Sequence, residues 1–147
     1  MATQDTKECD ETVDEAVEGV NRYEFNLLHC LAEGLPDLDD PRYAPVKAAP
    51  PPGCSAGRYG DFFCLRCERQ GQNLLDAVAP VCAEVRAASG VLMTDLGVEG
   101  LWEWKADGRD GHGATVVAQL LLMAAERASL IGYGVDDLVR FLRTAAG

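Results

Sequence analysis

The segment that most constrains the fold runs from Ala114 to Ala125 and reads ATVVAQLLLMAA. Its side chains are apolar nearly all round, and Gly132-Tyr133-Gly134 follows as a typical helix end. A helix without a polar face has to be surrounded by other elements, so we expect residues 114–129 to form the central helix of a bundle. The side chains expected in its core are Val116, Val117, Leu120, Leu121 and Met123.

A first amphipathic helix is expected to begin at Thr12, because Thr12-Val13-Asp14-Glu15 is typical of a capping box. Apolar side chains then recur at spacings of three and four, which places them on one stripe of a helix until Gly34 and Pro36 end it. The stripe consists of Val13, Ala16, Val17, Val20, Tyr23, Leu27, Leu28 and Leu31.

Further helices are expected over residues 61–89, with a break near Gln70-Gly71-Gln72 and a kink or a new start at Pro80. Residues 91–104 predict one or two short helices, and residues 106–113 predict a loop rich in glycine and aspartate. A last helix is expected from Val135 to Thr144, with Leu138, Val139, Phe141 and Leu142 packed inward. Because no stretch shows sustained strand alternation, we predict an all-α fold, a compact bundle of about six or seven helices.

The chain is expected to form one domain, since 147 residues can bury a single sizeable core. Residues 1–11 are polar and acidic and predict a flexible tail, followed by a single helical domain over residues 12–147. Residues 35–60 contain six of the seven prolines, so we expect an extended surface connection there.

The formal net charge of −11 argues against nucleic acid as a direct partner, because phosphates would be repelled. Twelve of the 24 acidic residues lie in the first 40 positions, which concentrates the negative field at one end. The start of the chain lacks a secretory pattern and no apolar run is long enough to span a bilayer, so we expect a cytoplasmic, intracellular protein without a membrane span.

Six cysteines are present, and in a reducing compartment they are expected to be thiols or metal ligands rather than disulfides. The spacing of Cys54, Cys64, Cys67 and Cys82 fits a tetrahedral zinc site, with Cys64-Leu65-Arg66-Cys67 as its sharpest element. The other interpretation is packing, because Cys82 lies in an apolar stripe and a cysteine there acts as a small hydrophobic side chain. We favour packing, without a cofactor, and keep zinc as the alternative.

Catalysis has little support, since the chain has only two histidines and no recognisable nucleophile, phosphate-binding or metalloprotease motif. His29 and Cys30 are adjacent, and neighbours on a helix point in different directions. We therefore predict a protein that is not an enzyme. The residues expected to contact a partner are Trp102, Trp104, Arg109 and His112.

The segment WKADGRDGHGATVVAQLLLMAA, residues 104–125, resembles the first homology region of Bcl-type apoptosis regulators, in particular their small divergent viral, poxvirus-like members. Asp107-Gly108 and Gly113 stand where that family has an aspartate–glycine loop and a glycine at the start of a helix. His112 and Ala114 replace the typical tryptophan and arginine, and no clear second homology motif or hydrophobic C-terminal anchor is present. The resemblance implies a helical protein that binds host apoptotic or innate-signalling proteins.

The leading hypothesis is therefore a non-enzymatic protein–protein interaction domain, such as a viral inhibitor of host apoptosis or innate immune signalling. The expected partner is an amphipathic helix or a signalling protein, with a homodimer also open. The alternative hypothesis is a small zinc-stabilised adaptor that uses Cys54, Cys64, Cys67 and Cys82.

Overall fold

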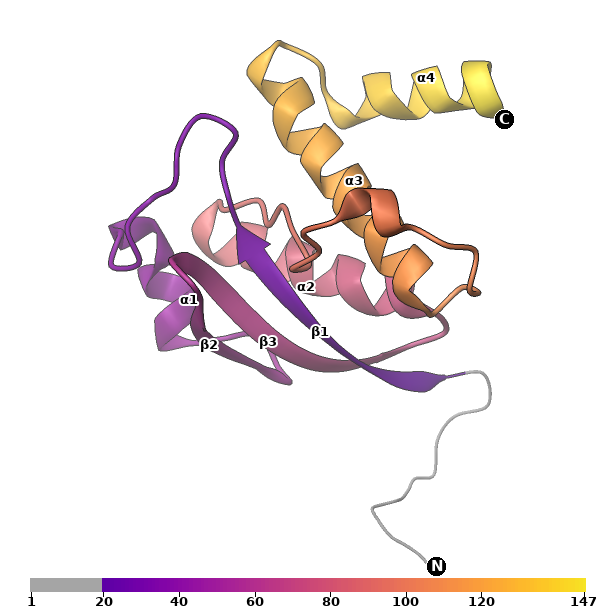
Figure 1. Cartoon of the computed structure of the whole chain (residues 1–147). Coiled ribbons are helices and arrows are strands. Elements are labelled where there is room, and N and C mark those ends of the chain that lie inside the picture. Colours follow the sequence, from indigo (N-terminus) through magenta and orange to yellow (C-terminus); the bar gives the residue numbers. More distant parts are fainter. Residues whose placement is uncertain (1–19) are drawn as a thin grey trace, which may run out of the picture.

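The computed structural model describes residues 20–147 and shows a mixed fold of helices and one sheet (Figure 1). The predicted all-α bundle is wrong, because residues 21–29 and 62–71, both expected to be helical, form strands. The elements in chain order are β1 (Asn21–His29), η2 (Pro41–Tyr43), α1 (Ala44–Ala48), β2 (Cys54–Tyr59), β3 (Phe62–Gly71), α2 (Leu74–Ser89), η3 (Leu101–Glu103), α3 (His112–Leu130) and α4 (Val135–Ala146).

The sheet has three antiparallel strands in the order β1-β3-β2, so β3 is hydrogen-bonded on both sides. Along β3 the side chains alternate: Leu65 and Cys67 are buried against the helices, whereas Arg66 is exposed on the other face. The alternation is hidden in the sequence because the strand begins with the apolar run Phe62-Phe63-Cys64-Leu65. Cys64 is buried on the outer face, where Gly97 lies next to Leu28 and Tyr59.

Strand β1 replaces the predicted first helix. Its apolar residues satisfy a period of two as well as the helical spacing, since Tyr23, Phe25 and Leu27 occupy alternate positions. Pairing with β3 decides between the two patterns, because it satisfies the backbone groups of residues 21–29 and buries Leu27 opposite Leu65. The predicted helix start at Thr12 lies outside the described residues.

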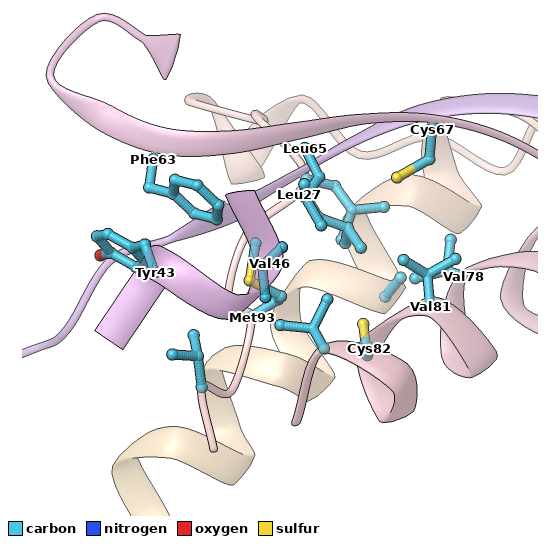
Figure 2. Packing of buried hydrophobic residues seen from close by; sticks show 14 of the residues in the cluster. Leu27, Tyr43, Val46, Phe63, Leu65, Cys67, Val78, Val81, Cys82 and Met93 are labelled. Carbon is cyan, nitrogen blue, oxygen red and sulfur yellow. The ribbon is translucent and has the colours of Figure 1, made fainter. Parts of the chain in front are cut away.

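Helix α2 covers the inner face of the sheet, as the second half of the expected 61–89 helical region. Asn73 caps its start by accepting a hydrogen bond from the amide of Asp76, at 2.9 Å, and Gly90 ends it with a φ of 75°. The helix runs through Pro80 as one element. Figure 2 shows Val78, Val81 and Cys82 of α2 packed toward Leu27 and Leu65 of the sheet, and these contacts form the core.

The proline-rich stretch carries short elements, and Tyr43 and Val46 from η2 and α1 reach the core with 1% of each exposed. Proline fixes φ near the helical value, so Pro41 and Pro45 suit the first positions of η2 and α1. Residues 91–104, expected to be helical, are instead extended, apart from the single turn η3.

Helix α3 is present where an apolar helix was expected, but it is not central. It packs beside α2, at the margin of the core (Figure 1). Val116 is fully buried, whereas Val117, Leu120 and Leu121 are 38%, 46% and 48% exposed. The predicted enclosure of this helix is therefore wrong, because α2 and residues 96–98 cover only one of its sides.

The buried side of α3 is fixed by a glutamine. The Gln119 carboxamide is 2% exposed and accepts hydrogen bonds from the amides of Leu96 and Val98, at 2.9 and 3.0 Å. Its nitrogen donates to the Val98 carbonyl, at 2.7 Å. These contacts satisfy backbone groups of an extended segment, as a neighbouring strand would. Gln119 thereby joins α3 to residues 96–98 and determines which side of α3 faces solvent.

The last helix, α4, matches the expected bounds but does not pack inward. No residue of α4 is buried, and the helix projects away from the sheet (Figure 1). Val139, Phe141 and Leu142, which were expected in the core, are 37%, 67% and 48% exposed. Its start is satisfied locally, since Asp137 accepts a hydrogen bond from the Gly134 amide, at 2.8 Å.

We predict that Gln119→Leu lowers the free energy of unfolding by about 3 kcal/mol, because it leaves buried backbone groups of residues 96–98 without partners. Leu120→Gln is the matched control on the exposed side of the same helix and should change stability by less than about 0.5 kcal/mol. Urea denaturation followed by circular dichroism measures both. Equal stability of the two variants would contradict the structural role of Gln119.

Candidate protein-binding surface

The four residues predicted to contact a partner all lie on the stretch from η3 to the start of α3, and all are exposed. The structure divides them between two hollows. Trp104 and Arg109 line one of about 430 Å³, between the starts of α2 and α3. Trp102 and His112 line another of about 640 Å³, next to residues 96–100. The four side chains therefore do not form one site.

The loop that carries Trp104 and Arg109 is held by two aspartates. Asp107 accepts hydrogen bonds from the amides of His112 and Gly113, at 3.0 and 2.9 Å, and so satisfies the start of α3. The Gly113 amide, with that of His112, lowers the pKa of the Asp107 carboxyl. Asp110 accepts a hydrogen bond from the Leu74 amide, at 3.1 Å, at the start of α2. One loop thus caps two helices and fixes the wall between them.

Gly113 allows the loop to approach α3 closely. A Cβ at this position would lie 2.1 Å from the Lys105 carbonyl oxygen and 3.2 Å from Nε1 of Trp104. Any larger residue would displace the backbone that holds Trp104, and the glycine is therefore required for the shape of the hollow.

The hollow between α2 and α3, called the Trp104 hollow below, has an apolar floor and a polar rim. Its apolar side chains are Leu75, Trp104, Ala106, Ala114 and Val117. Lys105 and Arg109 lie on the rim, and neither has an ion-pair partner among residues 20–147. Asn73 and Asp76 of the start of α2 complete the polar part of the lining.

Sequence reasoning missed Leu75 and Val117 as site residues, because both belong to apolar patterns that indicate a core. Their exposure of 38% each follows from how α2 and α3 meet. No local signal in the sequence distinguishes an apolar residue that is buried from one that lines an open hollow.

Trp102 is the most exposed large apolar side chain of the described residues, at 83%. Its hollow contains Glu99 and Glu103 together with His112, the first residue of α3.

The four cysteines of the zinc hypothesis are not gathered into one site. Cys54 lies opposite Cys67 on the inner face of the sheet, whereas Cys64 faces outward opposite Leu28 and Gly57. Within residues 20–147 there is no group of three or more histidine, cysteine, aspartate or glutamate side chains placed to hold a metal ion. Residues three apart lie on opposite faces of a strand, so the predicted Cys64-Cys67 pair would need a helix or a turn.

Cys67 and Cys82 both lie in the hydrophobic core, as expected for cysteines that pack as small apolar side chains. Burial, together with the neighbouring Cys54, raises the pKa of Cys67, and burial raises the pKa of Cys82 to about 11. Burial thus favours the neutral thiol form of both side chains. Cys82 packs in the core beside Val78 and Val81, as the apolar stripe indicated.

His29 takes a different role from the one that its place in a predicted helix suggested. Its side chain is 3% exposed, and Nδ1 lies 2.6 Å from the hydroxyl of Tyr43, whose ring stacks on Phe63 with centroids 4.2 Å apart. Burial, and next the Arg42 charge, lower the pKa of His29, so the hydrogen bond with the tyrosine hydroxyl joins a neutral imidazole. The pair joins β1 to η2 inside the fold.

Comparison of the chain with protein-family models, with curated proteins and with solved structures found no match. No helix within residues 20–147 is long and apolar enough to cross a membrane.

We predict that stability depends on His29 below neutral pH. Because the folded pKa lies below the unfolded value of about 6.5, the unfolded chain binds more protons, and stability falls as pH drops from about 6.5 to the folded pKa. Above pH 7 the neutral His29 makes its full contribution to the free energy of unfolding. His29→Gln should remove the fall in stability between about pH 6.5 and the folded pKa, whereas His112→Gln, at an exposed position, should leave that fall unchanged. Urea denaturation between about pH 5 and 8 measures the difference.

We also predict that Gly113→Ala disturbs the Trp104 hollow, because its Cβ collides with the Lys105 carbonyl. The variant should lose about 2 kcal/mol of stability or shift the tryptophan emission, as the loop moves away from α3. Gly57→Ala is the matched control, since a Cβ there meets nothing within 4 Å. A Gly113→Ala variant with unchanged stability and unchanged tryptophan emission would show that the loop does not approach α3 as closely as the structure indicates.

Proposed function

We propose that this chain is a non-enzymatic protein-binding domain that holds an apolar segment of a partner protein in the Trp104 hollow. The observation that carries the proposal is the combination of an apolar floor with Lys105 and Arg109, which outnumber the one acidic lining residue, Asp76, in a chain with a net charge of −11. Exposed aromatic and arginine side chains beside a concave apolar surface are typical of protein interfaces.

The two rim cations select the chemistry of the partner. An acidic residue next to the apolar anchor would pair with Lys105 or Arg109, whereas a basic segment would be repelled by the rest of the chain. We therefore propose a short acidic and apolar peptide segment as the ligand. An amphipathic helix or an extended chain could present it.

The proposal names a class of ligand and no pathway. The expectation of a viral inhibitor of apoptosis came with a family whose fold is a helical bundle, and this chain instead builds its core on a sheet. Asp107 and Gly113, which carried the resemblance, have structural roles at the start of α3.

The test is selection of peptides from a displayed random library against the full chain, followed by fluorescence anisotropy with the enriched sequences. We expect peptides that combine acidic and large apolar residues. Trp104→Ala should weaken their binding about tenfold or more, because it removes the largest side chain of the hollow. Arg109→Glu should weaken binding further as ionic strength falls, because like charges then repel more strongly.

Trp102→Ala is the matched control, since Trp102 is exposed and lies in the other hollow. It should leave peptide affinity within about twofold. The proposed site would be refuted if no peptide is enriched, or if Trp104→Ala and Trp102→Ala lower the peptide affinity equally.

A further inference from the structure

A second surface lies at the C-terminal end of the described chain. The turn after α3 and one side of α4 expose a continuous series of large apolar side chains, which we call the α4 face. Its members are Leu130, Ile131, Tyr133, Val135, Val139 and Leu142, with exposed fractions from 37% to 74%, whereas Phe141 lies on another side of α4. The helix projects away from the sheet (Figure 1), so this face has no neighbour within residues 20–147.

The α4 face is large for an exposed apolar patch. Together its six side chains expose on the order of 600 Å², which is the upper end of the range for a monomer and somewhat less than what each partner of a stable dimer buries. The Trp104 hollow involves none of these residues, so the two surfaces are independent.

The pattern of α4 fits a second helix. Val135, Leu138 and Leu142 recur at spacings of three and four, which forms a straight seam for helix–helix packing. Val139 lies beside this seam, near the middle of the helix. A helix with apolar residues on both sides of its midpoint can pack against an antiparallel copy of itself.

The charges of α4 identify that second helix as another copy of the same chain. Asp137 and Arg140 already form an ion pair with each other. Asp136 and Arg143 have no ion-pair partner among residues 20–147, and a separation of seven places them on the same side of the helix, next to Val139.

We propose that two copies of the chain form a symmetric dimer through antiparallel packing of their α4 faces. A two-fold axis between residues 139 and 140 brings Asp136 of each copy level with Arg143 of the other, so that two ion pairs flank the apolar seam. The antiparallel arrangement also places the negative end of each helix dipole beside the positive end of its neighbour. The proposed partner of the α4 face is thus the α4 face of a second copy of the chain.

The test is a charge exchange in the full chain, followed by sedimentation equilibrium. Wild-type protein should reach twice its mass of 15.8 kDa. Asp136→Arg and Arg143→Asp should each weaken self-association about tenfold, because each creates like charges at both ends of the seam. The double variant D136R/R143D should restore the wild-type constant, since the pairs re-form with reversed polarity.

Asp61→Arg is the matched charge control for Asp136→Arg, because it makes the same change in net charge on the turn between β2 and β3. It should not weaken the dimer. A double variant that stays as weak as the single ones would overturn the antiparallel pairing, as would single variants that behave like the Asp61 control.

The apolar contribution is tested with Leu142→Asp, which should give a monomer, against Leu35→Asp, a residue of similar exposure on the loop after β1. Circular dichroism should show that both variants keep the fold, since neither residue is in the core. A monomeric wild-type chain overturns the proposal. Hydrogen exchange would then distinguish an open α4 from one covered by another segment, which would protect the amides of residues 135–146.

Peptide binding at the Trp104 hollow should be unchanged in Leu142→Asp. A chain that dimerises without binding peptides would refute the proposed function alone, and the reverse result would refute the dimer alone.

Discussion

The hydrogen bonds of Gln119 determine how the second half of the chain sits on the first. Residues 94–98 run beside the end of β1, where Leu28 exchanges backbone hydrogen bonds with Thr94 and Asp95. The groups of Leu96 and Val98 are satisfied by one carboxamide from α3. Only one rotation of α3 about its axis allows this, and that rotation places Val117, Leu120 and Leu121 toward solvent.

Both candidate surfaces follow from that rotation. Val117 becomes part of the floor of the Trp104 hollow, and the loop capped through Asp107 and Asp110 forms its wall. The end of α3 then directs α4 away from the sheet, which leaves the α4 face open (Figure 1). The apolar residues of α3 are thereby divided between core and surface by a single buried amide.

The two surfaces differ in the chemistry that they offer. The Trp104 hollow is concave and has a cationic rim, which favours a small acidic and apolar segment. The α4 face is a helix side with alternating charge at its margin, which favours another helix. A dimer through α4 would present two copies of the hollow, and paired sites of this kind raise the apparent affinity for a bivalent partner.

Local patterns in the sequence determined the helices of the second half of the chain. The apolar periodicity of residues 74–85, 114–129 and 135–144 predicted helices where α2, α3 and α4 lie, although the kink or new start expected at Pro80 is absent from α2. These signals are local because helical hydrogen bonds join residues four apart. Trp104 and Arg109 were likewise expected at the surface, and both are exposed, since aromatic and cationic side chains in a glycine-rich loop rarely belong to a core.

The tertiary structure decided the rest. Residues 21–29 fit a helical and an alternating pattern equally well, and the choice was made by β3, whose residues follow about forty positions later. The burial of α3 and α4 was also undecided locally, because an apolar side chain looks the same in a sequence whether it meets a core or an open surface. Sequence therefore determined where these helices form, and long-range packing determined which of their sides are buried in the core.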